Sequence, residues 1–141
     1  MSTPIYPLVV GSVVTYTLTA ALTTGSFLNT GLRINVSTAL LGDFRLPVTG
    51  MTAPVAGVLQ GILVPRDFSG NSGGSPTSGL LWTPFTFNPL PAPGNSSGAF
   101  VFSADRVSID RDCDLWLFNN ALGQSIPNGS VLSYQLWTPA T

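Results

Sequence analysis

Three residue types on which much enzyme chemistry depends are absent from this chain. Of its 141 residues, none is lysine, glutamate or histidine, so the five cations are arginines and the six anions are aspartates. Without histidine, no side chain has an ordinary pKa near neutrality, and without lysine there is no amine for a Schiff base. We therefore expect a protein that is not an enzyme and that uses no cofactor. A pair of aspartates of the kind that hydrolyses glycosides is the enzymatic alternative.

Charge of either sign is also scarce. Only 8% of the residues are charged and the formal net charge is −1. Binding to nucleic acid requires clustered basic side chains, whereas these five arginines are scattered along the chain. We expect no nucleic-acid partner. A surface with so little charge repels neighbouring copies weakly and is suited to close association.

The chain has a single cysteine, Cys113, which cannot form an internal disulfide. With no histidine or lysine to lower its pKa, we expect a small buried side chain on a strand.

The first 18 residues lack the features of a targeting segment. They contain no charged side chain and are interrupted by Pro4, Pro7 and Gly11, so they resemble neither a signal peptide nor a membrane span. We expect a protein made in the cytoplasm without a signal peptide and without a membrane partner. Residues 1–11 are interpreted as an extended N-terminal arm, and residues 12–141 as one domain.

The residues that are abundant favour strands. The chain uses Thr, Ser, Val, Phe, Gly and Pro in place of the Lys and Glu of helix surfaces, and apolar residues alternate with polar ones over short segments separated by Gly and Pro. We predict an all-β fold, a single-domain β-sandwich or jelly roll with seven to nine short antiparallel strands. The segments expected to contain strands are residues 12–20, 32–37, 44–48, 55–64, 80–88, 98–119 and 131–138.

Several of these segments carry finer predictions. The first two are expected to pair with each other, and Pro47 places residues 44–48 at an edge or bulge. The apolar run 55–64 is expected to be a central strand in which Gly57 and Gly61 allow close backbone approach or a bulge. A helix is the alternative for this run, and its two glycines disfavour it. The Gly- and Ser-rich residues 65–79 are interpreted as an exposed, mobile loop with little to pack.

The most strongly patterned stretch is residues 98–119, interpreted as two strands with a bend near residues 104–106. One predicted apolar face runs from Val101 through Val107 and Ile109 to Cys113 and beyond.

Aspartates alternate at the end of this stretch, at Asp110, Asp112 and Asp114. Alternating carboxylates suit a calcium ion, but the glycine at the sixth position and the glutamate at the twelfth position of a calcium loop are missing. Solvation or pairing with Arg106 or Arg111 is the preferred interpretation. A salt-bridge network between subunits and a metal site are the alternatives.

Aromatic residues allow a second kind of site. Exposed rings could form a carbohydrate platform, but the strand positions of most of them indicate core packing. These residues are Tyr6, Tyr16, Trp82, Trp116, Tyr134 and Trp137. With 44% hydrophobic residues and a mean hydropathy of +0.37, the chain has more apolar surface than one small core needs, which implies a protein partner.

Three segments resemble the strand pattern of small β-sandwich structural proteins of tailed bacteriophages. They are residues 55–70 (VAGVLQGILVPRDFSG), 114–119 (DLWLFN) and 129–137 (GSVLSYQLW). The long loop at residues 68–79 departs from that pattern. The resemblance implies a capsid decoration, or cement, protein in the virion, on the outer capsid surface. Its partners would be the major capsid protein and further copies of itself, often as a homotrimer at three-fold positions.

In this interpretation the arm and one sheet edge would bind capsid subunits, and apolar and Asp/Arg contacts would join copies around a three-fold axis. The interface candidates are Pro4, Ile5, Tyr6, Pro7, Leu8, Phe68, Arg106, Asp110, Arg111 and Asp112. The first alternative is a tail, fibre or receptor-binding module that recognises a surface glycan through residues 68–79 and 89–97. A shell-forming jelly-roll subunit is the second, and the lack of a basic arm disfavours it.

Overall fold

The computed structural model describes residues 8–35, 40–76, 84–91 and 99–139, and within these ranges it contains strands and no helix. No helix in this part of the chain could therefore span a bilayer. The strands are Leu8–Val10 (β1), Val14–Thr17 (β2), Phe27–Ile34 (β3), Leu41–Thr49 (β4), Val58–Pro65 (β5), Pro84–Leu90 (β6), Ala99–Ser108 (β7), Cys113–Asn120 (β8) and Val131–Pro139 (β9). The predicted all-β domain with seven to nine antiparallel strands is confirmed.

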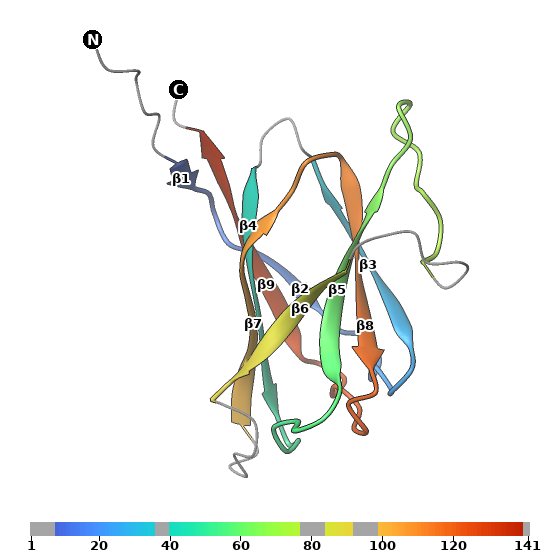
Figure 1. Cartoon of the computed structure of the whole chain (residues 1–141), viewed down its shortest axis with the longest axis vertical. Helices are drawn as coiled ribbons and strands as arrows, with labels where there is room; N and C mark the ends of the chain where they lie inside the picture. Colours follow the sequence, from blue (N-terminus) through green and yellow to red (C-terminus); the bar gives the residue numbers. More distant parts are fainter. Residues whose placement is uncertain (1–7, 36–39, 77–83, 92–98, 140–141) are drawn as a thin grey trace.

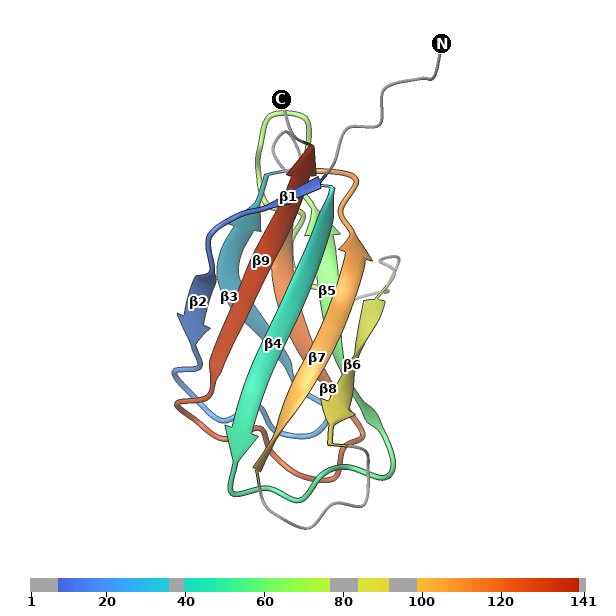
Figure 2. The same ribbon diagram turned by 90° about the vertical axis from the view of Figure 1, so that its left-hand side faces the viewer.

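The strands form one antiparallel sheet that curls over, so that its two halves face each other (Figures 1 and 2). The order is β1-β9-β4-β7-β6-β5-β8-β3, and β2 also pairs with β9. Strand β6 joins the halves, because residues 84–87 pair with β5 while residues 88–90 pair with β7. This shared strand places the architecture between a β-sandwich and a half-barrel.

The core fills the space between the halves. Strand alternation directs Phe44, Leu46 and Val48 of β4 inward, and all three are buried. The ring of Phe44 lies 5.0 Å from the ring of Phe85 on β6 and 5.8 Å from that of Tyr134 on β9, between ring centroids. Burying one such side chain contributes about 1.5–3 kcal/mol.

Strand β4 is flanked by β9 and β7 and is therefore not an edge strand of the sheet. However, β9 pairs with β4 only as far as Arg45. Pro47 therefore lies beyond the part of β4 that pairs with β9. The predicted edge position is wrong for the strand as a whole and applies only to this end of it.

The predicted pairing of the first two strand segments is wrong. Strand β2 pairs with β9, and β3 pairs with β8 in the other half of the sheet. The connection between β2 and β3 crosses from one half to the other, and along it Leu22 forms a bridge with Ile126. Proximity in sequence was therefore a poor guide to pairing.

Strand β5 is central, as predicted, with β6 and β8 on its two sides. It begins at Val58 instead of Val55, because Gly57 adopts a positive φ of 72°. The expected close approach at both glycines is present: an added Cβ would lie 2.1 Å from the Ala121 carbonyl oxygen at Gly57, and 2.1 Å from the Phe85 ring at Gly61.

Strand β7 contains the predicted bend, and it takes the form of a bulge. Arg106 has a φ of 54°, and the register with β4 shifts between Gly42 and Phe44. The extra residue reverses the alternation, since Phe102 is buried before the bulge whereas Ile109 is buried after it. The predicted apolar face is therefore wrong for Val101. Strands β7 and β8 lie in opposite halves and form a corner.

Candidate functional site

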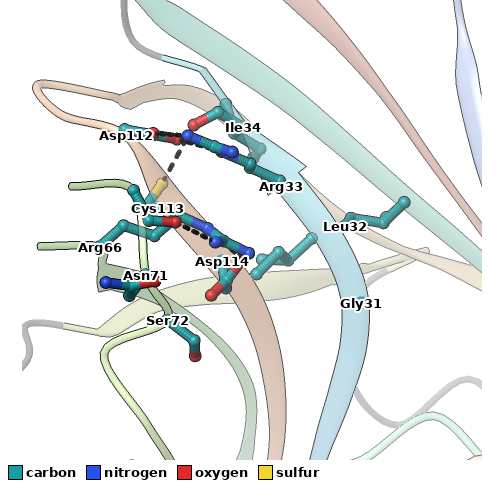
Figure 3. Close-up of polar contacts among 12 residues, drawn as sticks. Gly31, Leu32, Arg33, Ile34, Arg66, Asn71, Ser72, Asp112, Cys113 and Asp114 are labelled. Atoms are coloured by element: carbon teal, nitrogen blue, oxygen red, sulfur yellow. Dashed lines mark hydrogen bonds and ion pairs between the residues drawn. The ribbon is translucent and has the colours of Figure 1, made fainter.

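Two of the alternating aspartates form ion pairs with arginines from other parts of the sheet (Figure 3). Asp112 accepts two hydrogen bonds from the guanidinium of Arg33, one of them from Nε at 3.0 Å. Asp114 accepts bonds from Nε and Nη2 of Arg66 at 3.0 and 2.8 Å. Strand pairing explains the arrangement, because Arg33 is the cross-strand neighbour of Asp114, and β5, which Arg66 directly follows, pairs with β8.

The pair between Asp114 and Arg66 is the more buried of the two. Only 7% of the Asp114 side chain and 20% of the Arg66 side chain are exposed. Removing one partner from such a pair leaves a charge that is poorly hydrated. We therefore infer that this ion pair stabilises the fold.

The loop after β5 is held locally by hydrogen bonds. Arg66 donates from Nη1 to the Gly70 carbonyl, and the Asp67 carboxylate accepts bonds from the backbone amides of Ser69 and Asn71. The segment is a loop and is mostly exposed, as predicted, and these hydrogen bonds fix the conformation of its first part. Phe68 is fully exposed.

Hydrogen bonds lower the pKa values of two carboxylates in this cluster. The hydrogen bond from Arg33 lowers the pKa of Asp112, and hydrogen bonds from Asn71 lower the pKa of Asp67. Both carboxylates are thus ionised near neutrality and already accept hydrogen bonds. A general acid needs a raised pKa instead.

The third aspartate, Asp110, is separate from these pairs. Its side chain is 78% exposed and lies 3.5 Å from Nε of Arg111. The preferred partners Arg106 and Arg111 were therefore wrong for Asp112 and Asp114, which pair with arginines far away in sequence. Within the described ranges, no group of three or more metal-binding side chains comes together.

Arg106 forms part of a second cluster, on β4, β7 and β9. Its guanidinium carbon lies 4.5 Å from the centre of the Trp137 ring, and its backbone amide donates to Oδ1 of Asp43 at 2.8 Å. Trp137 donates from Nε1 to Oδ2 of Asp43 at 2.6 Å. Partial burial raises the pKa of Asp43, but these two hydrogen bonds outweigh it and lower the pKa overall.

Sequence reasoning missed Asp43 and Trp137 as partners of Arg106. The bulge explains this, because the extra residue in β7 is what places the Arg106 amide against Asp43. No local sequence signal marks that position apart from the break in alternation.

The lone cysteine and the aromatic residues are mostly structural. Cys113 is buried, as predicted, and burial raises the pKa of its thiol to about 12. Tyr134 is buried in the core and Tyr16 packs against it, whereas Trp116 and Trp137 are only half buried and are not part of the core cluster. Core packing was thus the wrong expectation for these two tryptophans. Tyr6 and Trp82 lie outside the described residues.

A cavity of about 490 Å³ opens at the β7–β8 corner, between Leu63, Phe85 and Ile109. Asp110 is the one carboxylate among its described lining residues. Glycoside hydrolysis uses two facing carboxyl groups. The cavity therefore does not contain the aspartate pair that the enzymatic alternative requires.

Exposed apolar side chains gather at the β1–β2 edge of the sheet. Val9, Val10, Val13 and Val14 are 50%, 42%, 57% and 38% exposed. We call residues 9–17 the β1–β2 edge. Strands β1 and β2 both pair with β9 on one side, and no other described strand pairs with them (Figure 2).

Four of the interface candidates come together, and the other described ones lie apart from them. Leu8 belongs to β1 and pairs with Pro139, while Pro4, Ile5, Tyr6 and Pro7 lie outside the described residues. Asp110, Arg111 and Asp112 line one shallow depression together with Phe68, and Arg106 lies in the second cluster. No protein-family model, curated protein or solved structure matches this chain.

Proposed function

We propose that the chain is a structural virion protein, a capsid decoration or cement protein that binds the outer surface of a shell and stabilises it through many protein contacts. One observation carries this proposal: an open sheet edge exposes a row of apolar side chains, while most charged side chains are paired within the chain. Apolar surface without free charge is the composition expected of an interface core.

A catalytic role has little support. The chain has no histidine, lysine or glutamate, and the aspartates with lowered pKa values are held by hydrogen bonds from arginine, tryptophan or backbone groups. We infer that these side chains stabilise the fold. A non-catalytic protein that acts by binding is compatible with every one of these pairs.

The proposed partners are the major capsid protein and further copies of the chain. With a net charge of −1, copies on a shell would repel one another weakly, and many modest contacts would sum to firm attachment. The resemblance in sequence implies that copies bound at three-fold positions form homotrimers on the outer surface of the virion.

Cosedimentation with capsid shells that lack the protein tests this proposal. We expect the purified chain to pellet with the shells and to saturate at a number of copies fixed by the shell symmetry. A chain without residues 1–7 should bind at least ten-fold more weakly if the arm contributes, and β1 is kept in this truncation because it pairs with β9. A chain that stays in the supernatant at saturating concentration contradicts the proposal.

A glycan-binding virion module is the second candidate, and Phe68 is the observation that favours it. This ring is fully exposed on a segment fixed by Arg66 and Asp67, and exposed aromatic rings bind sugar faces. A glycan array should then show binding that Phe68→Ala abolishes. An array with no bound glycan removes this candidate.

A further inference from the structure

The outer side of β2 carries backbone groups that no described strand satisfies. The amide of Leu18 donates to the Ser130 carbonyl at 2.8 Å, which fixes which residues face β9. Because hydrogen-bonded and non-hydrogen-bonded pairs alternate in an antiparallel ladder, Val14 and Tyr16 also bond to β9. The amide and carbonyl groups of Thr15 and Thr17 therefore point away from the sheet.

This edge lacks the devices that protect free strands. Soluble monomers guard such edges with charges, proline, bulges or short strands, because an open edge is a template for pairing. Residues 12–18 read SVVTYTL and contain no charge, no proline and no glycine. Apart from the shortness of β2, nothing in this segment disfavours the addition of a strand.

The opposite edge of the sheet, β3, differs in each respect. Its register with β8 shifts between Asn29 and Arg33, and Gly31 in that stretch has a positive φ of 71°. Arg33 adds a charge there, held by Asp112. One outer edge is thus irregular and charged while the other is regular and uncharged, and only the second suits pairing with another chain.

We propose that β2 pairs with β2 of a second copy, so that two copies share one continuous antiparallel sheet across a two-fold axis at Thr15. In this register Thr15 faces Thr15 and Val13 faces Thr17, and the outward groups of these odd-numbered residues meet in hydrogen-bonded pairs.

A second copy fits this edge because the edge is complementary to itself. A two-fold axis brings each side chain near its own equivalent, so any charge on the edge would be repelled by its copy. The first charged side chain in the chain is Arg33. β-Branched residues face one another in the proposed register, which is a favourable cross-strand combination.

The inference does not rest on the proposed function, because it concerns the purified chain alone. On a shell, a homotrimer would use other surfaces, and the β2 contact would link copies of neighbouring trimers.

Light scattering after size exclusion, across a range of concentrations, tests the inference. The wild-type chain should have twice the chain mass of 14.7 kDa. Thr15→Pro removes an amide that points away from the sheet, so the hydrogen bonds between β2 and β9 are kept. Proline is tolerated at such a position on an edge strand. Thr15→Lys places two cations at the axis. Each variant should raise the dimer dissociation constant at least ten-fold.

Thr49→Lys is the matched control, because Thr49 is an exposed residue at the end of β4, and this variant should remain a dimer. Circular dichroism and the melting temperature establish that each variant is folded; if Thr15→Pro unfolds, Thr15→Lys decides, since it leaves the backbone unchanged. A wild-type monomer or trimer, or a Thr15→Lys dimer as stable as wild type, overturns the inference. A monomer that still pellets with shells overturns it while leaving the proposed function intact.

Discussion

Asp114 is the one charged residue among the buried residues that the structure describes. Its carboxylate is buried and accepts two bonds from Arg66. Asp114→Asn keeps the size of the side chain but leaves the Arg66 guanidinium without its anion, so we expect the free energy of unfolding to fall by about 2 kcal/mol. Urea denaturation measures this change.

The control is Asp110→Asn, because Asp110 is exposed on the same corner. We expect its effect to stay within about 0.5 kcal/mol. Equal losses of unfolding free energy in the two variants would show that the buried ion pair stabilises the fold no more than the exposed carboxylate does.

Acid should weaken the fold through three other carboxylates. The pKa values of Asp43, Asp67 and Asp112 are lower in the folded chain than in a free aspartate. A lowered pKa stabilises the fold above the ordinary value of about 3.9, and this contribution is lost as the pH falls through the lowered values.

The midpoint of urea unfolding should therefore be similar at pH 6 and pH 5 and should decrease below about pH 4. Asp112→Asn should reduce this dependence, since it removes one of the titrating groups. A midpoint that is constant down to pH 2 would contradict the assignment of these hydrogen bonds.

At this scale the sequence predicted the type of interaction better than the partners. Aspartates paired with arginines were expected at Asp112, but its partner Arg33 is 79 residues away. Such a contact follows from which strands pair, and strand pairing is not encoded in the local pattern. The buried, unreactive Cys113 was predictable because its environment depends only on the alternation along its own strand.

Among the elements, the start of β5 offers a sharp test of backbone packing. Gly57 has a positive φ, and a Cβ there would lie 2.1 Å from the Ala121 carbonyl oxygen. Gly57→Ala should therefore combine backbone strain of about 1 kcal/mol with a collision that costs about 1–3 kcal/mol more. Thermal unfolding should show a clear decrease in melting temperature.

Gly25→Ala is the matched control, since Gly25 has a positive φ of 80° but open space where the Cβ would lie. It should show the strain without the collision. If both variants lose the same stability, the close approach of β5 to the end of β8 is not as tight as described.

The elements also show where strand patterns fail. Alternation located residues 44–48 of β4 and residues 131–138 of β9, where each strand keeps one register, and a continuous apolar run located β5. Alternation failed for Val101 because a bulge at Arg106 reverses the inward face of β7. It also failed for the pairing of β2 with β3, because the connection between them crosses the core and leaves both strands with partners distant in sequence.

For the whole molecule, the fold class was predictable from composition, but the curled, shared sheet was not. Joining of the halves through β6 depends on two different partners for two parts of one strand. The surplus of apolar residues was also visible in the sequence. The exposure of four valines along the β1–β2 edge was not, because it follows from the pairing of both short strands with β9.

We propose that this edge joins the protein to copies of itself on the outside of a shell. Cryo-electron microscopy of capsid shells saturated with the purified chain tests that claim most directly. We predict added density for the nine-stranded domain on the outer surface, with its β1–β2 edge against a neighbouring copy. Shells without added density, or density in which that edge faces only solvent, would contradict the account.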